Sequence, residues 1–380
     1  MTLAPLNPPE RLLMGPGPSN PDPAVLAAMR AHPVGHLDPY FVTLMDQTMG
    51  GLRDVFRTRN HHTIPVSGTG SAGLEAIMLN LLEPEDHAVV AINGYFGQRI
   101  AELARRSGAT VRTVEAAPGE IVDPAAVEKL LREQPAKVVA FVHLETTTGA
   151  CQPIQEMVEV ARACDALVVM DCVTSLGGMP LDLDTLGVDA AGSCSQKCLG
   201  AAPGLGPITL GPRAMATVAA RRRKPSTWYL DLSLLFQYWG EESSERRRVF
   251  HHTAPVASIY GFHEALRIVL AEGLEHRWAR HRTAHEALQR GLDRLGLSVF
   301  TPAPNRAPTI TVISVPQGLE EAAVRSRLLS LGVEMGGGLG PLAGKVWRVG
   351  VMGHNARPET IARFLEGLEQ ALRAEGWRNE

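Results

Sequence analysis

Short apolar runs alternate with amphipathic segments along the first half of the chain. The runs are rich in valine, isoleucine and threonine, and such nearly continuous apolar character is typical of strands covered on both faces. They are residues 63–67, 88–92, 110–114, 137–142 and 166–171. The segments between them, such as 71–86 and 123–135, carry apolar side chains at helical spacing. This alternation predicts an α/β domain that has a mostly parallel central sheet with helices on both faces.

The pattern changes near residue 255, where a long helix-rich stretch begins. Two strand-like runs, 308–315 and 345–351, follow it and have a helical segment between them. A final amphipathic helix begins at Pro358 and carries its apolar residues on one face. These features predict a second, smaller α+β unit at the C-terminal end.

The chain of 380 residues is longer than one typical hydrophobic core, which favours two domains. Residues 1–20 are too rich in proline to form a domain, and we expect an extended segment that lies across the surface or into a cleft. We assign residues 21–260 to the large α/β domain and residues 261–380 to the small C-terminal domain.

Composition and charge narrow the class of protein. The chain is 45% hydrophobic and 20% charged, with a formal net charge of −3, as is ordinary for a soluble globular protein. It has no long basic tract, so we expect neither nucleic-acid nor membrane binding. The five cysteines form no C-x-x-C motif, which argues against a disulfide framework. The N-terminal sequence has no apolar run of signal-peptide length, and we expect a cytoplasmic location.

A glycine-rich turn follows the first strand-like run. Gly68, Gly70 and Gly73 match the pattern G-x-G-x-x-G, which occurs in nicotinamide-dependent oxidoreductases. Such enzymes also place an acidic residue at the end of the next strand, where this chain has Asn93. Free backbone N–H groups at a helix N-terminus favour any anion, so the turn is also compatible with the phosphate of another cofactor. A third interpretation is a turn that only lets strand and helix pack closely.

Two pairs of adjacent histidines are weak metal-site candidates. They are His61–His62 and His251–His252. Neighbouring side chains on a strand point to opposite faces, and on a helix they diverge by about 100°. The sequence therefore predicts no metal site.

One lysine and one aspartate stand out by their position. Asp171 ends the run 166–171, and Lys197 ends a second strand-like stretch, 188–197, among small residues. Taken singly, Lys197 is compatible with a surface lysine, and Asp171 is compatible with a helix cap or a solvated acid at the end of a strand. An amine held among small residues forms imines with aldehydes, and a carboxylate can hold the protonated nitrogen of a pyridine ring. With Phe96 as a stacking ring and the glycine turn as a phosphate site, these parts make up a pyridoxal-phosphate site.

The chain resembles the class V, fold-type I pyridoxal-phosphate aminotransferases, and most closely their alanine–glyoxylate/serine–pyruvate group. The resemblance covers nearly the whole length. It is carried by LLMGPGPSNPDP, GHLDPYF, VSGTGSAGLEA, NGYFGQR, HLETTTGACQP, DCVTSLGG, SCSQKCLGAAPGLG, FHHTAPV and GKVWRVGVMG, in this order.

The resemblance implies a role for each matching residue around the cofactor ring. Lys197 would hold the cofactor covalently and move the proton during catalysis. Asp171 would pair with the pyridine nitrogen. Val173 would pack on one face of the ring, and Phe96 would stack on it at a position that is often tryptophan in this group. Thr146 would contact the cofactor near its phenolic oxygen.

The resemblance also implies how phosphate and substrate are bound. Arg348 would bind the substrate carboxylate as a bidentate partner. Thr253 would reach the phosphate of the neighbouring subunit's cofactor, so the resemblance implies a homodimer with shared active sites. Phe250 replaces a frequent tyrosine and cannot donate a hydrogen bond to that phosphate. Within the same subunit, the implied phosphate-binding residues are Thr69, Gly70, Ser71 and Gln196.

The predicted function is a ping-pong transamination from alanine or serine to glyoxylate or pyruvate. We expect a small, uncharged amino donor, because no second basic residue is evident at a site position. A ureidoglycine–glyoxylate or an aminoethylphosphonate–pyruvate aminotransferase is an alternative within the class. A nicotinamide-dependent oxidoreductase and a binding protein that kept the fold without its cofactor are alternatives from other classes.

Overall fold

The computed structural model describes residues 2–240 and 248–378, and a seven-stranded sheet lies at the centre of its larger part. The strand order is β2-β8-β7-β6-β5-β3-β4, and every strand except β8 runs in the same direction. The strands are β2 (His62–Ser67), β3 (His87–Ile92), β4 (Thr110–Glu115), β5 (Val138–Val142), β6 (Leu167–Asp171), β7 (Ala190–Gly192) and β8 (Leu205–Leu210). The predicted mostly parallel sheet is confirmed.

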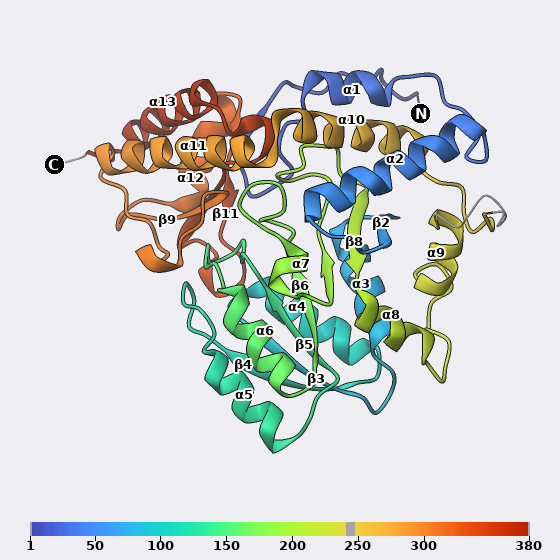
Figure 1. Cartoon of the computed structure of the whole chain (residues 1–380). Coiled ribbons are helices and arrows are strands. Elements are labelled where there is room, and N and C mark those ends of the chain that lie inside the picture. The colour runs from blue at the N-terminus through green and yellow to red at the C-terminus, as the bar shows by residue number, and fades with distance from the viewer. Residues whose placement is uncertain (1, 241–247, 379–380) are drawn as a thin grey trace.

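Helices lie on both sides of this sheet (Figure 1). Several begin where an aspartate precedes a proline, and α5 is an example. The Asp123 carboxylate accepts a hydrogen bond from the Ala125 N–H at 2.9 Å, and Pro124 occupies the first helical position. The helices of this part are α1 (Pro23–Met29), α2 (Pro39–Phe56), α3 (Gly70–Leu81), α4 (Tyr95–Arg106), α5 (Pro124–Glu133), α6 (Ile154–Ala163), α7 (Leu183–Leu186), α8 (Pro212–Ala219), α9 (Leu232–Trp239) and α10 (Val256–Glu272).

A smaller α+β part follows at the C-terminal end, as predicted. Its antiparallel sheet has the strand order β11-β12-β9, and helices pack against it. The strands are β9 (Ile310–Ser314), β11 (Gly336–Gly337) and β12 (Val346–Gly350), and the helices are α11 (Leu274–Arg294), α12 (Glu321–Ser330) and α13 (Pro358–Ala374). The predicted fold class, a large α/β part with a small α+β part, is therefore confirmed.

The N-terminal segment connects the two parts. Strand β1 (Leu12–Leu13) pairs with β10 (Val333–Glu334) of the small part. A few residues later, the Ser19 N–H donates to the carbonyl of Gln196 at 3.0 Å, next to Lys197. The extended segment thus runs from the small domain into the region of the candidate site.

The change of hydrophobic core falls within α11. Trp278, near its start, packs in the core of the large part, whereas Ala284, one and a half turns later, packs in the core of the small part. The boundary predicted between residues 260 and 261 lies inside α10, whose buried side chains belong to the large core. The division into domains stays a prediction.

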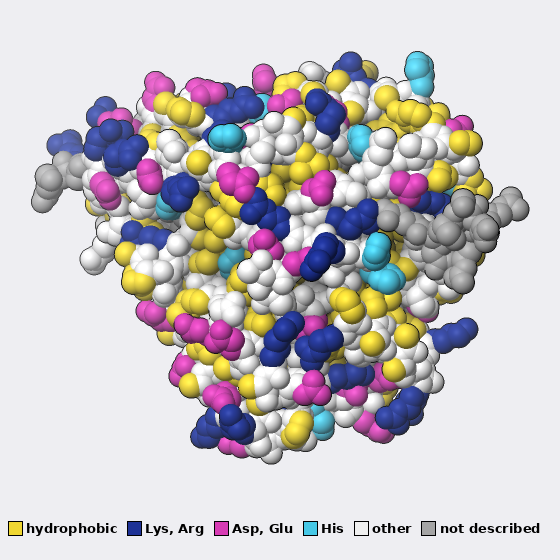
Figure 2. Space-filling view, in the orientation of Figure 1, with side chains coloured by type: hydrophobic (Ala, Val, Ile, Leu, Met, Phe, Trp, Pro, Cys, Tyr) yellow, Lys and Arg dark blue, Asp and Glu magenta, His cyan; other side chains and the backbone are white. Residues whose placement is uncertain are grey.

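Basic and acidic side chains are interspersed over the face seen in Figure 2. Over residues 2–240 and 248–378, no helix combines the length and the apolar character that crossing a membrane requires. The same residues contain no group of three or more histidine, cysteine or acidic side chains arranged to hold a metal ion.

Candidate active site

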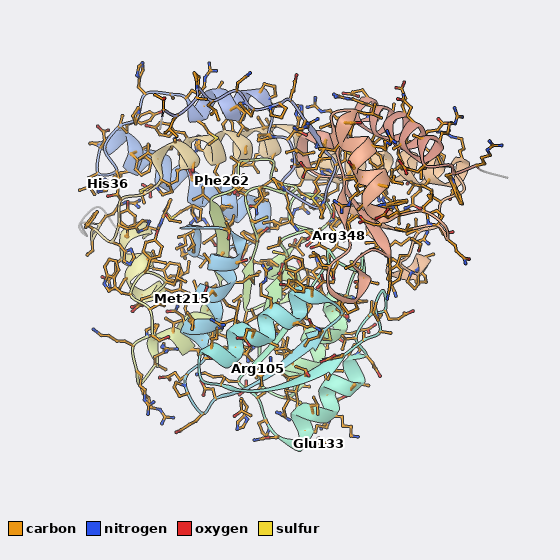
Figure 3. The ribbon with its side chains drawn as sticks, turned by 180° about the vertical axis from the view of Figure 1, so that it is seen from behind. His36, Arg105, Glu133, Met215, Phe262 and Arg348 are labelled. Carbon is orange, nitrogen blue, oxygen red and sulfur yellow. The ribbon has the colours of Figure 1, made fainter. Side chains whose placement is uncertain are left out.

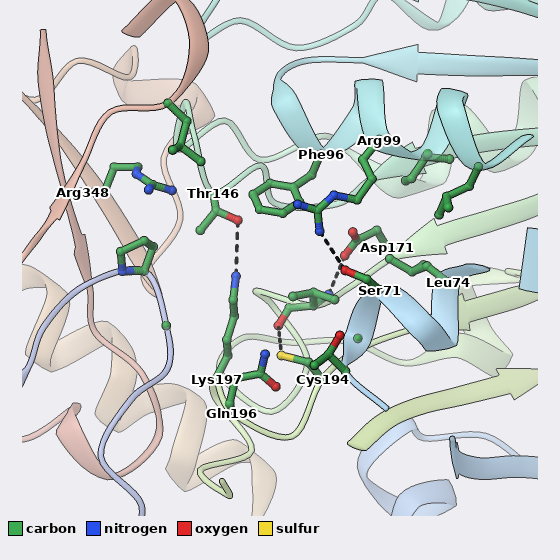
Figure 4. A pocket seen from close by; sticks show the side chains of 18 residues that line it. Ser71, Leu74, Phe96, Arg99, Thr146, Asp171, Cys194, Gln196, Lys197 and Arg348 are labelled. Carbon is green, nitrogen blue, oxygen red and sulfur yellow. Dashed lines mark hydrogen bonds between the residues drawn. The ribbon is translucent and has the colours of Figure 1, made fainter. Parts of the chain in front are cut away.

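A cavity of about 290 Å³ lies at the carboxyl ends of the parallel strands, where α/β proteins commonly bind ligands. The predicted site residues line it, with Thr253 as the exception. Arg348 and Leu339 reach the cavity from the small part, and Pro16 and Gly17 reach it from the N-terminal segment. Figure 4 shows Lys197 and Arg348 on one side of this space and Ser71, Arg99 and Asp171 on the other.

Lys197 lies in the loop that follows β7, and its side chain is buried. The amine donates hydrogen bonds to the hydroxyls of Thr174 at 3.1 Å and Thr146 at 3.4 Å. Burial lowers the pKa of this amine, because desolvation disfavours its charged form. Gly17 packs against the side chain so closely that an added Cβ would lie 3.1 Å from Lys197 Cγ. The amine is therefore held in a fixed position as a candidate nucleophile.

Asp171 is the last residue of β6 and is also buried. Burial raises the pKa of its carboxyl to about 6, although the Val173 N–H, which donates to it at 2.8 Å, acts in the opposite direction. A carboxylate in such a position gains a charge partner when a protonated ring nitrogen binds. The aspartate thus fits a pyridine ring.

Phe96 is positioned by a buried carboxylate that the sequence-based prediction missed. Glu145 accepts hydrogen bonds from the N–H groups of Phe96 at 2.9 Å and Gly97 at 3.3 Å, and so caps the start of α4. Gly94 allows this contact, because an added Cβ there would lie 2.3 Å from Glu145 Cγ. Glu145 lies in the quoted motif HLETTTG, but its role depends on the approach of β3 and β5, which spacing alone does not reveal.

The start of α3 forms a cup that fits a phosphate. Thr69 precedes the helix and makes no side-chain cap, so the first N–H groups remain available for an anion. Gly70 is required by packing, since a Cβ there would lie 2.9 Å from the carbonyl oxygen of Ser193. Among the described residues, the buried Oε1 of Gln196 has no hydrogen-bond partner. With the amide turned, its NH₂ group would serve a phosphate oxygen, so these residues fit pyridoxal phosphate.

Arg348 lies on β12, and Figure 4 shows the end of its side chain directed at the cavity. Its Nε donates to the carbonyl of Gly337 at 2.6 Å, which fixes the guanidinium plane. Burial lowers the pKa of this group, and the charge of Glu145 opposes the shift. A guanidinium held in this way can bind a carboxylate through two parallel hydrogen bonds.

Thr253 and Phe250 lie outside the cavity of their own chain. Both side chains are exposed, and Phe250 has its ring 5.3 Å from that of His36. The role of Thr253 at the cofactor of a neighbouring subunit therefore stays a prediction.

The expectation that the site contains no second basic residue is wrong. Arg99 lines the cavity, and its Nη1 donates to the hydroxyl of Ser71 at 2.8 Å. Its guanidinium carbon lies 4.6 Å from the centre of the Phe96 ring. The signal was present in NGYFGQR, because residues three apart on a helix share a face.

Comparisons with known proteins show the family to which the whole chain is similar. The sequence matches the family Aminotransferase class-V over residues 13–344. A (S)-ureidoglycine–glyoxylate transaminase from Bacillus subtilis is 38% identical over 96% of this chain and 91% of that protein. An alanine–glyoxylate aminotransferase from Rattus norvegicus is 40% identical over 97% of this chain and 89% of that protein.

The fold is also similar to that of a solved aminotransferase structure. The alanine–glyoxylate aminotransferase from Nostoc sp. is 47% identical to this chain, covers 98% of both chains and has a TM-score of 0.95. Similarity of this extent in sequence and in structure confirms the family that the motifs indicated. The chain therefore belongs to the class-V aminotransferases and is a pyridoxal-phosphate-dependent enzyme of fold type I.

Proposed function

We propose that this aminotransferase moves the amino group of alanine or serine to glyoxylate or pyruvate. The observation that carries the proposal is one cavity that is lined by the buried Lys197 and Asp171 and, from the small part, by Arg348. Pyridoxal phosphate and the substrate would share this cavity of about 290 Å³, which leaves little room for a large substrate. Membership of the class-V aminotransferases argues against the alternative of a nicotinamide-dependent oxidoreductase.

Each residue would act at a defined atom. Pyridoxal phosphate supplies an aldehyde and an electron-withdrawing ring. The Lys197 amine would hold that aldehyde at rest and, once released by the substrate amine, would take the proton from the substrate Cα. Asp171 would keep the ring nitrogen protonated, and Arg348 would bind the substrate carboxylate so that Cα lies within reach of Lys197.

Donor and acceptor would use the same cavity in turn, which makes the reaction ping-pong. Both are small acids with one carboxylate beside the reacting carbon, so one arginine at the position of Arg348 serves both. Only after the product of the donor leaves would the acceptor enter.

A ureidoglycine–glyoxylate aminotransferase is the second candidate. It is favoured by the similarity to the Bacillus subtilis transaminase, whose name shares glyoxylate with the other relatives described above. An aminoethylphosphonate–pyruvate aminotransferase is not favoured by any of these relatives.

A panel of half-reactions tests the proposal. The purified enzyme is mixed with single amino acids, and loss of the visible absorption band of bound pyridoxal phosphate is followed. We expect alanine and serine to bleach the band fastest. Bleaching by ureidoglycine alone would favour the second candidate, and a protein that neither carries the band nor gains it with added cofactor would contradict both.

We also propose that two copies form a homodimer with shared sites, because Thr253 lies exposed outside its own cavity. The cytoplasmic location stays a prediction, which fractionation of cells that express the protein would check.

A further inference from the structure

Arg99 holds a fixed position at the phosphate end of the cavity. Its Nη1 donates to the Ser71 hydroxyl at 2.8 Å, and its guanidinium carbon lies 4.6 Å from the centre of the Phe96 ring. The first contact joins it to the start of α3, and the second joins it to the ring that would stack on the cofactor. Figure 4 shows Arg99, Ser71 and Phe96 grouped on the side of the cavity opposite Arg348.

Arg99 is the basic side chain that the described lining residues place next to the phosphate cup. Among the described residues that line the cavity, the basic side chains are those of Lys197, Arg99 and Arg348. Lys197 would be bound to the cofactor aldehyde, and Arg348 lies on the far side beside Gly337. The described residues of the cup itself offer neutral donors, namely backbone N–H groups, the hydroxyls of Thr69 and Ser71, and the amide of Gln196.

A phosphate monoester carries close to two negative charges at neutral pH. Neutral donors at a helix start offset only part of such a charge, whereas an arginine fork binds phosphate oxygens with full charge and fixed geometry. The hydroxyl of Ser71 already accepts from Arg99, so its own proton is free to point towards a phosphate oxygen.

We propose that Arg99 is a cofactor-binding residue that pairs with the phosphate of pyridoxal phosphate and shares this group with Ser71. The proposal rests on the assignment of the cavity as the cofactor site. It gives Arg99 no part in recognising a side-chain carboxylate of the substrate, so the expected preference for an uncharged donor is retained.

The test measures the affinity of the cofactor-free enzyme for pyridoxal phosphate and for pyridoxal, which lacks the phosphate, by fluorescence titration. The variants are Arg99→Gln and Arg99→Lys. Arg105→Gln is the matched control, because Arg105, labelled in Figure 3, is exposed in the last turn of the same helix and does not line the cavity. Circular dichroism checks that each variant is folded.

We expect Arg99→Gln to weaken binding of pyridoxal phosphate by about 10- to 100-fold, and to change binding of pyridoxal by less than about twofold. Arg99→Lys keeps the charge without the fork and should lie between Arg99→Gln and the wild type. Arg105→Gln should match the wild type for both compounds.

Two results would overturn the proposal. Equal weakening for both compounds would mean that Arg99 acts only through the Phe96 ring. Unchanged affinity for pyridoxal phosphate would remove Arg99 from the phosphate site, and a raised KM for aspartate or glutamate would then assign it to a substrate carboxylate. If the wild-type enzyme itself does not bind pyridoxal phosphate more tightly than pyridoxal, the assignment of the cavity fails instead.

Discussion

Burial shifts the pKa values of Lys197 and Asp171 in opposite directions for the same reason. Desolvation disfavours the charged form of each group, which lowers the pKa of the Lys197 amine and raises that of the Asp171 carboxyl to about 6. A protonated ring nitrogen would restore a charge partner to Asp171. The cofactor-free protein therefore contains a buried carboxyl whose ionisation weakens the fold.

Replacing Asp171 by asparagine should remove this cost. The carboxyl has a pKa of about 6 in the folded chain, against the ordinary aspartate pKa of 3.8, so the folded state binds more protons between these pH values. The stability that Asp171 contributes is present below pH 3.8 and is lost as the pH rises through about 6. Without cofactor, Asp171→Asn should equal the wild type near pH 4 and exceed its unfolding free energy by on the order of 3 kcal/mol at pH 8.

Denaturant titrations of the cofactor-free proteins from pH 4 to 8 measure this difference. Asp123→Asn controls for the exchange itself, because Asp123 is an exposed cap of α5 and asparagine caps equally well. A difference between Asp171→Asn and the wild type that does not change with pH would contradict the prediction.

The site residues that the sequence predicted most directly are placed by strands and the loops after them, whereas those that it missed are placed by packing between neighbouring elements. Asp171 ends a strand-like run, and its place at the carboxyl rim follows from strand direction. Lys197 was found because a strand-like stretch leads towards the same rim, although the strand itself ends at Gly192. Arg99 and Glu145 depend on how neighbouring elements approach each other. The spacing in NGYFGQR places Arg99 on the same helix face as Phe96, but its contact with Ser71 depends on how α4 packs against α3, which no local pattern records.

At the scale of elements, the buried parallel strands were the most predictable part. The five apolar runs correspond to β2 to β6, and each bound agrees within one residue. Four of them, β2, β3, β5 and β6, are buried, which explains their nearly unbroken apolar character, whereas β4 lies at the edge of the sheet and is only partly buried.

Strand β8 was missed, because its Gly206 and Pro207 are typical of turns rather than of strands. The stretch 188–197 was predicted as a strand up to Lys197, but β7 ends at Gly192. Small residues continue beyond the end of the strand, since the loop that carries Lys197 packs as tightly as the sheet. Small residues therefore indicate burial here, and they do not distinguish a strand from a buried loop.

At the scale of the whole molecule, one surface region exposes several large aromatic side chains. Trp228 and Tyr229, exposed to 60% and 42%, lie against His251 and His252, and Phe250, exposed to 56%, precedes these histidines in the chain. Trp228 stacks on His251 at 4.1 Å between ring centres. Exposed aromatic side chains gathered in this way are typical of interfaces. Their place supports the proposed homodimer.

Replacing Phe250 by aspartate should weaken the dimer, because a charge would be buried in the interface. Sedimentation equilibrium should show a dimer for the wild type and a dissociation constant raised by at least about tenfold for Phe250→Asp. Leu331→Asp is the matched control, since Leu331 is 44% exposed on the small domain, and it should leave the dimer unchanged. A wild type that is monomeric at every concentration would contradict the proposal.

The account depends most directly on the covalent attachment of pyridoxal phosphate to Lys197. Borohydride reduction of the purified enzyme, followed by proteolysis and mass spectrometry, measures where the cofactor is attached. We predict that the peptide containing Lys197 carries the mass of the reduced cofactor, and that Lys197→Ala carries none. Attachment at another lysine, or a label that persists in Lys197→Ala, would contradict the account.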